Sequence, residues 1–223
     1  MSFESVQACL FDMDGLLLDT ESIYTEVTQS IIGPLGHQYH WGLKSNMIGR
    51  PAIESATYLV ETLELPFSPE EYLEQRSVKL LEFMPTCKPL PGARELIEHL
   101  HSNGIPIAVA TSSSLSLFET KTMHHKDWFS LFDTVVTPDS ERVVKGKPAP
   151  DIFLEAARQL NVSAEKALVF EDAPSGLQAG ISAGMQVVAV PDPNMDKDRY
   201  QQATVVLDSL VDFSPQDFGL PPF

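Results

Sequence analysis

The chain has 223 residues, of which 43% are hydrophobic and 21% are charged, and its formal net charge is −16. This composition supports a sizeable core and excludes large-scale disorder, and the length suits one large domain or one domain with a smaller insert. The acidic balance repels polyanions, so we expect no nucleic-acid partner and no binding to anionic membrane surfaces.

Compartment signals are few. The N-terminal stretch MSFESVQACL lacks a basic start followed by a long apolar run, and no segment reaches the roughly 18 apolar residues of a membrane span. The two cysteines, Cys9 and Cys87, lack the spacing of a metal site or a CxxC pair, so we expect structural roles for them. These features favour a cytoplasmic protein, which we further expect to be a monomer.

Short apolar runs rich in β-branched residues predict buried strands along most of the chain. They span residues 6–11, 105–110, 132–136, 167–170, 185–190 and 204–207. Amphipathic stretches lie between them, such as GARELIEHLHSNG at residues 92–104, and these predict helices. Strands that alternate with helices indicate the α/β class, with a doubly wound, Rossmann-like parallel sheet.

The interval 18–88 breaks this alternation. It contains helical patterns at 21–32, 52–62 and 68–83 without a strand signal between them. The last pattern opens with a capping-box match at Ser68 and Glu71, with Pro69 at the first helical position. We therefore predict a core domain of residues 1–17 and 89–223 and an all-helical insert of residues 18–88.

Polar residues follow the predicted strands. Because ligands of open α/β sheets bind at the carboxyl ends of the strands, these residues are the candidates for a site. They are Asp12 and Asp14 after the first strand, the hydroxyls of TSSS at 111–114 after the second, Lys147 in KGKPAPD, and Glu171 and Asp172 in FEDAPSG.

This set of side chains has a chemical logic. Carboxylates that converge on one crevice repel each other unless a cation lies among them, and an all-oxygen ligand set suits Mg²⁺. A lysine, hydroxyls and a helix N-terminus suit a phosphate group. Attack of a carboxylate on a phosphate needs neutralisation, which Mg²⁺ and Lys147 would supply. The pattern predicts a small phosphorylated molecule as the substrate.

The segments DMDGLLLDT, Thr111 after a strand, GKPAPD with Lys147, and FEDAPSG resemble, in this order, the motifs of the haloacid dehalogenase superfamily. The similarity is to its branch of Mg²⁺-dependent phosphatases and mutases, and it implies a phosphoric monoester hydrolase with a helical cap at residues 18–88. It also implies that Asp12 is the nucleophile that forms an aspartyl-phosphate, and that Asp14 is the general acid and base.

The same resemblance implies the remaining roles. Asp12, the backbone carbonyl of Asp14, and Asp172 would hold Mg²⁺, with Glu171 as a further ligand or close neighbour. Lys147 would orient Asp12 and bind the phosphoryl oxygens. The other residues implied in substrate binding are Thr111 and Ser112 at the phosphoryl group and Arg50, in the segment MIGRP, in the cap.

Further stretches, NGIPIAVATSSS, HKDWFSLF and DFGLP, resemble the branch of the family that contains pseudouridine-5'-phosphatase. This similarity implies a nucleotide-like sugar phosphate monoester, pseudouridine 5'-phosphate, as the substrate. Aromatic residues of the insert are candidates for stacking on a base: Tyr24, Tyr39, Trp41 and Tyr58. The residues leave open a phosphatase of glycerol phosphate or another small sugar phosphate, a β-phosphoglucomutase-like mutase, and a catalytically idle phosphate-binding module.

Overall fold

The computed structural model describes residues 3–47 and 52–223, and the chain divides into two compact units. The first unit comprises residues 1–19 and 88–223, and the second comprises residues 20–87. Leu18 bridges Pro89, and the Asp19 N–H donates to the Lys88 carbonyl at 2.8 Å. These contacts place Leu18, Asp19 and Lys88 in the first unit. The second unit, residues 20–87, is therefore slightly shorter than the interval 18–88.

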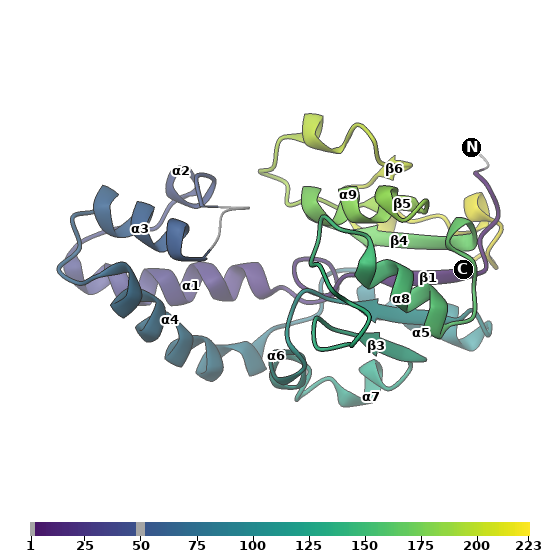
Figure 1. The fold of residues 1–223 in the computed structure, drawn as a ribbon, viewed down its shortest axis with the longest axis horizontal. Helices are drawn as coiled ribbons and strands as arrows, with labels where there is room; N and C mark the ends of the chain where they lie inside the picture. Colours follow the sequence, from purple (N-terminus) through teal and green to yellow (C-terminus); the bar gives the residue numbers. More distant parts are fainter. Residues whose placement is uncertain (1–2, 48–51) are drawn as a thin grey trace. The chain divides into compact units, whose positions relative to one another are not determined.

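The first unit is built on a parallel sheet (Figure 1). Its strands are β1 (Ala8–Phe11), β2 (Ile107–Ala110), β3 (Thr134–Val136), β4 (Ala167–Glu171), β5 (Gln186–Ala189) and β6 (Val205–Val206). They are ordered β3-β2-β1-β4-β5-β6, and every neighbouring pair is parallel. The prediction of a doubly wound α/β sheet is confirmed.

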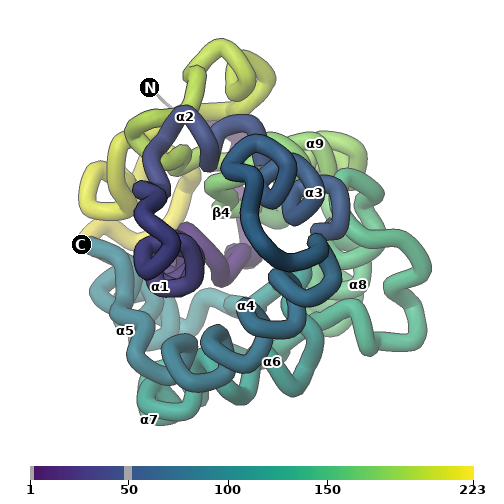
Figure 2. The backbone as a smooth tube through the Cα atoms, turned by 90° about the vertical axis from the view of Figure 1, so that its left-hand side faces the viewer, coloured from purple at the N-terminus to yellow at the C-terminus, as the bar shows by residue number. Residues whose placement is uncertain are grey.

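Helices cover both faces of this sheet. They are α5 (Ala93–Ser102), α6 (Leu115–Lys121), α7 (Lys126–Phe129), α8 (Asp151–Gln159) and α9 (Pro174–Ser182). Figure 2 shows α5 and α7 on one side of β4 and α8 and α9 on the other. Among the described residues of both units, short 3₁₀ segments lie at Gly33–Leu35, Met84–Thr86, Ala164–Lys166, Lys197–Tyr200, Leu210–Asp212 and Pro215–Phe218.

The central strand β1 is completely buried, and its register fixes the edge that carries the polar residues. Phe11 pairs with Val109 of β2 and with Phe170 of β4. The Phe11 and Phe170 rings stack with their centroids 4.5 Å apart. Burial of such a side chain contributes roughly 1.5–3 kcal/mol, so the strand ends are held by a packed core.

The second unit is helical, with α1 (Thr20–Ile32), α2 (Trp41–Lys44), α3 (Ala52–Thr62) and α4 (Pro69–Phe83). The helix α4 packs against α1 and α3. The Glu71 N–H donates to Ser68 Oγ at 3.2 Å and the Ser68 N–H donates to Glu71 Oε2 at 2.7 Å, which is the predicted capping box. The single turn α2 is too short to leave a periodic pattern in the sequence.

Within residues 3–47 and 52–223, no helix combines the length and the apolar character that a membrane crossing requires.

Candidate active site

The backbone hydrogen bonds of the sheet continue one residue beyond β1 and β2, into the polar loops that follow these strands. The Asp12 N–H donates to the Phe170 carbonyl at 3.0 Å, and the Thr111 N–H donates to the Val136 carbonyl at 3.1 Å. Because these bonds extend the parallel ladders, Asp12 and Thr111 are held as firmly as strand residues. The buried pairing of β1, β2 and β4 thus positions the start of each loop.

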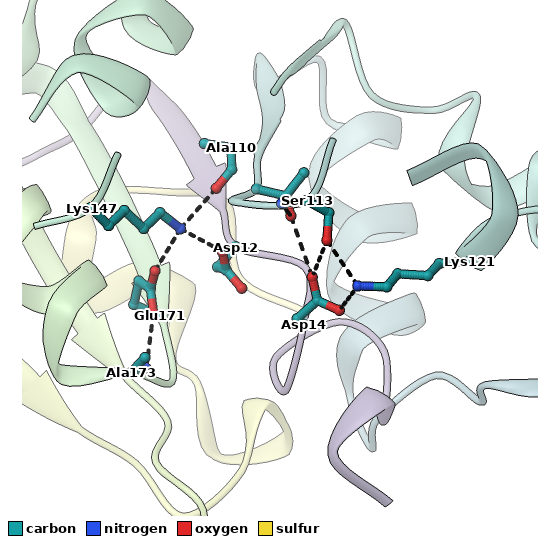
Figure 3. A network of polar contacts seen from close by, with 9 residues as sticks. Asp12, Asp14, Ala110, Ser113, Lys121, Lys147, Glu171 and Ala173 are labelled. Carbon is teal, nitrogen blue, oxygen red and sulfur yellow. Dashed lines mark hydrogen bonds and ion pairs between the residues drawn. The ribbon is translucent and has the colours of Figure 1, made fainter. Parts of the chain in front are cut away.

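One group of charged side chains, here called the Asp12 cluster, consists of Asp12, Lys147, Glu171 and Asp172. The Lys147 Nζ donates to Asp12 Oδ1, to Glu171 Oε1 at 2.7 Å and to the Ala110 carbonyl at 3.0 Å (Figure 3). Only 5% of the Lys147 side chain is exposed. All three donors of the ammonium group therefore have acceptors, which compensates for its burial.

The loop before α8 carries Lys147 to this position. The Asp151 carboxylate, at the start of α8, accepts hydrogen bonds from the N–H groups of Val144 at 3.1 Å and Lys145 at 2.9 Å. The Phe153 ring lies under the ammonium group, with Lys147 Nζ 4.8 Å from the ring centroid. Both contacts favour one path for the loop and one direction for the lysine.

Glu171 is fixed from two sides. One carboxylate oxygen accepts from Lys147, and the other accepts from the Ala173 N–H at 2.9 Å. The helix α9 packs directly against the Glu171 side chain at Gly176. A Cβ atom at Gly176 would lie 1.6 Å from Glu171 Oε1. The glycine is required because of this close approach, and the glutamate has little room to move.

Burial and neighbouring charges shift the pKa values of Asp12 and Lys147 strongly. Burial raises the pKa of Asp12 to about 7; Lys147 opposes this rise, and the nearby Glu171 and Asp14 add to it. Burial alone would lower the pKa of Lys147, but Asp12 and Glu171 outweigh burial and raise it. The ammonium group therefore stays charged, and it is the cation that allows carboxylates to share this space.

The cluster also has the donor set of a metal site. Asp12, Glu171 and Asp172 each offer a carboxylate oxygen, and these oxygens all lie within 4.8 Å of one another. An all-oxygen set of carboxylates suits Mg²⁺, so the residues fit the predicted ion. Glu171 already accepts from Lys147 and Ala173, which favours Asp12 and Asp172 as direct ligands. The Asp14 carbonyl as a ligand stays a prediction.

Asp14 belongs to a separate group with Ser113 and Lys121 (Figure 3) and with Thr111, here called the Asp14 cluster. Its Oδ1 accepts from Lys121 Nζ at 2.5 Å. Its Oδ2 accepts from Ser113 Oγ at 2.9 Å and more distantly from Thr111 Oγ1 at 3.4 Å. The two aspartates therefore have different lysine partners.

Lys121 was missed by the sequence analysis, as was the contact of Ser113 with Asp14. Lys121 ends α6, and its side chain is 1% exposed. A signal was present, because Lys121 lies three and four residues after Phe118 and Leu117, on the apolar stripe of a helix. A lysine in such a place is buried only where a partner charge receives it.

The remaining predicted substrate-binding residues differ in their surroundings, and of these Thr111 belongs to the Asp14 cluster. Thr111 is buried and its Oγ1 accepts from the Ser113 N–H at 3.0 Å, whereas Ser112 is exposed. Arg50 lies outside the described residues. The structure thus brings together Asp12, Lys147, Glu171 and Asp172 in one cluster and Asp14 and Thr111 in the other.

A doubly wound sheet with charged residues gathered at its carboxyl edge is the arrangement in which α/β enzymes bind their ligands. The model of the haloacid dehalogenase-like hydrolases matches residues 6–184, so the chain belongs to this family. It is a phosphoric monoester hydrolase that acts on small phosphorylated compounds. The predicted family is confirmed.

Two of the similar proteins are named after different substrates. The chain is 46% identical to (DL)-glycerol-3-phosphatase 2 of Arabidopsis thaliana, over 98% of this chain and 93% of that protein. It is 47% identical to the probable pseudouridine-5'-phosphatase of Drosophila melanogaster, over 98% of this chain and 96% of that protein. A haloacid dehalogenase family hydrolase of Deinococcus radiodurans, solved with bound phosphate and sodium, has the same fold. Its TM-score is 0.85 at 23% identity, over 99% of this chain and all of that one.

Proposed function

We propose that this enzyme is a Mg²⁺-dependent phosphatase that hydrolyses a nucleotide-like sugar phosphate monoester, pseudouridine 5'-phosphate, through an aspartyl-phosphate on Asp12. The observation that carries the mechanism is the buried group of carboxylates around Lys147, whose oxygens lie within 4.8 Å of one another. Mg²⁺ held by Asp12 and Asp172 would neutralise phosphoryl charge when bound.

In the proposed first half-reaction the two aspartates have different roles. An Asp12 carboxylate oxygen forms a bond to phosphorus, and the bond from phosphorus to the sugar oxygen breaks. Asp14 gives its proton to that oxygen as it leaves. Lys147, already bonded to Asp12, holds this carboxylate and adds positive charge where the phosphoryl oxygens would lie.

The second half-reaction restores the enzyme. Asp14, now a carboxylate, takes a proton from a water molecule, whose oxygen attacks phosphorus and releases Asp12. Phosphate monoesters are among the slowest uncatalysed hydrolyses, so preorganised charge and proton transfer both have large effects. A mutase differs at this step only, because its aspartyl-phosphate is passed back to a sugar instead of to water.

The substrate proposal has support from the insert, which we propose to be a substrate-binding cap. A cavity of about 270 Å³ within residues 20–87 is lined by Tyr24, Tyr39, Lys44 and Arg76, among others. The Arg76 guanidinium lies 5.0 Å from the centroid of the Tyr24 ring. Aromatic rings and cationic groups suit a base with carbonyl oxygens better than they suit a bare polyol.

Glycerol 3-phosphate is the second candidate substrate, because relatives of nearly equal identity carry either name. Small size and the absence of a base distinguish it from pseudouridine 5'-phosphate. A cytoplasmic, monomeric enzyme without nucleic-acid or membrane partners stays a prediction from the sequence.

The test is phosphate release from pseudouridine 5'-phosphate, uridine 5'-phosphate, glycerol 3-phosphate, glucose 6-phosphate and flavin mononucleotide, with Mg²⁺ and with EDTA. We expect release only with Mg²⁺ and a kcat/KM at least about 100-fold higher for pseudouridine 5'-phosphate, or roughly 2.7 kcal/mol of discrimination. Asp12→Asn should abolish release. Release by this variant or in EDTA would contradict the mechanism, and binding without turnover by the unaltered enzyme would favour the idle module.

The cavity is tested within the same panel by Tyr24→Leu, with Tyr58→Leu as the matched control, since Tyr58 does not line the cavity. Loss of a stacked base costs about 1–3 kcal/mol. Tyr24→Leu should therefore lower kcat/KM for pseudouridine 5'-phosphate by about 5- to 150-fold and leave glycerol 3-phosphate unaffected. Equal losses for both substrates would contradict base recognition in this cavity.

A further inference from the structure

A second buried lysine lies outside the motifs of the family match. Lys121 closes α6, its side chain is 1% exposed, and its Nζ donates to Asp14 Oδ1 at 2.5 Å and to Ser113 Oγ at 2.8 Å. Figure 3 shows it on the far side of Asp14 from Asp12 and Lys147. None of the roles assigned so far needs this residue.

Burial of an ammonium group has a large desolvation penalty that one ion pair offsets only when the geometry is good. An apolar residue of similar size would fill the same space, and such replacements of buried ion pairs are often neutral or stabilising. Packing therefore gives no reason for a lysine at this position. The charge is best explained by what it does to its partner, Asp14.

The contacts of Asp14 show what that effect is. Ser113 and Thr111 both donate to Oδ2, so the hydroxyls alone leave Oδ1 without a fixed direction. Lys121 binds Oδ1 and also binds the Ser113 hydroxyl, which closes a ring of polar contacts around the carboxylate. The terminal torsion of an aspartate is broad, and contacts to both oxygens restrict it to one orientation.

Asp14 itself is exposed enough to meet a substrate. Its side chain is 24% exposed, whereas that of Lys121 is enclosed, so the carboxylate separates the lysine from solvent. A group that reaches the reaction only through another side chain acts by orienting that side chain. The Gly15 turn, with φ of 76°, gives Asp14 a tight backbone, and Lys121 supplies the matching restraint on the side chain.

We propose that Lys121, together with Ser113, is a positioning residue that orients the Asp14 carboxylate for proton transfer to the leaving oxygen. This inference rests on the proposed phosphatase function, in which Asp14 is the general acid. The proton moves from Asp14 to the sugar oxygen as before, and Lys121 exchanges no proton and touches no substrate.

The test compares esters that differ in their need for a proton. The alkoxide that leaves pseudouridine 5'-phosphate or glycerol 3-phosphate needs one, whereas the phenolate that leaves 4-nitrophenyl phosphate does not. Since kcat/KM reports the step in which the leaving group departs, Lys121→Met should lower it about 100-fold for the alkyl esters. For 4-nitrophenyl phosphate the expected loss is less than about threefold.

Two further variants make the result decisive. Ser113→Ala removes the hydroxyl that both partners share, and it should show the same selective loss to a smaller degree, even if Lys121→Met does not fold. Lys126→Met, at an exposed lysine of α7, is the matched control and should change neither ester. Equal losses for both kinds of ester, or no loss in either variant, would overturn the proposal. Activity in Asp12→Asn would instead overturn the proposed function.

Discussion

The Asp12 cluster and the Asp14 cluster begin two residues apart in the chain, yet their surroundings differ. Asp12 is buried among carboxylates and shares Lys147 with Glu171. Asp14 is partly exposed and has its own lysine, Lys121, with hydroxyl groups in place of further carboxylates. The first environment suits a metal ion and a nucleophile, and the second suits a single proton-transferring group with a fixed direction.

The difference also separates what the motifs reveal from what they do not. The side chains of the Asp12 cluster lie at the carboxyl ends of β1 and β4 and, for Lys147, on the loop between β3 and α8, where a sequence pattern can locate them. The lysine of the Asp14 cluster comes from the end of a short helix. Two substitutions and one change of pH test this contrast.

Loss of Lys147 should have the largest effect on stability. Lys147→Met leaves Asp12 and Glu171 buried without the cation between them, which should lower the free energy of unfolding by about 3–5 kcal/mol. Urea unfolding in EDTA measures this, with the exposed neighbour Lys145→Met as the control. Lys121→Met should lose less, because Asp14 retains access to water. An equal loss in the two buried-lysine variants would remove the proposed contrast.

The pH dependence of stability in EDTA should come next. The pKa of Asp12 rises from 3.8 to about 7 on folding, so between these values the unfolded chain releases a proton that the folded protein keeps. The contribution of Asp12 to stability is therefore present below pH 3.8 and is lost as the pH rises to about 7.

Asp12→Asn lacks this titration and serves as the reference. Relative to it, the unaltered protein should lose on the order of a few kcal/mol of unfolding free energy between pH 4 and pH 8. Chemical unfolding at a series of pH values measures the difference. A gain in relative stability over this range would mean that Lys147 outweighs the burial of Asp12.

Crowding at Glu171 should have the smallest effect on stability. Gly176→Ala places a methyl group against the Glu171 carboxylate and should cost about 1–3 kcal/mol, because the side chain and α9 must move apart. The control is Gly146→Ala, where a Cβ meets nothing within 4 Å. The displaced Glu171 should lower kcat/KM for alkyl and aryl esters alike, in contrast to Lys121→Met. A selective loss for alkyl esters would mean that the two clusters are coupled.

Much of the sheet could be predicted because each strand is a short apolar run, and β1, β2 and β4 are buried on both faces. The predicted limits differ where hydrogen bonding intervenes. The run 105–110 begins as a strand only at Ile107, since Pro106 has no N–H to donate. The order of the strands was not predicted, because runs that are apolar on both faces contain no information on their neighbours.

The candidate site likewise has a part that could be predicted from the sequence and a part that could not. Asp12, Lys147, Glu171 and Asp172 were predicted because their positions after strands bring them to one edge of the sheet. Lys121 was not predicted, because its contact with Asp14 joins residues 107 positions apart through the path of α6. Local patterns show that a lysine lies on an apolar stripe, but the partner is determined by tertiary packing.

The two chain segments that connect the units, Leu18–Asp19 and Lys88–Pro89, lie side by side, and this has an evolutionary consequence. The chain leaves and re-enters the α/β unit at points joined by a hydrogen bond of 2.8 Å between the Asp19 N–H and the Lys88 carbonyl. A whole module can therefore be exchanged, lengthened or shortened between these points without interrupting a strand. Under the proposal that this unit binds the substrate, descendants of one ancestral enzyme would acquire new specificities by replacing residues 20–87 while inheriting the same carboxylates.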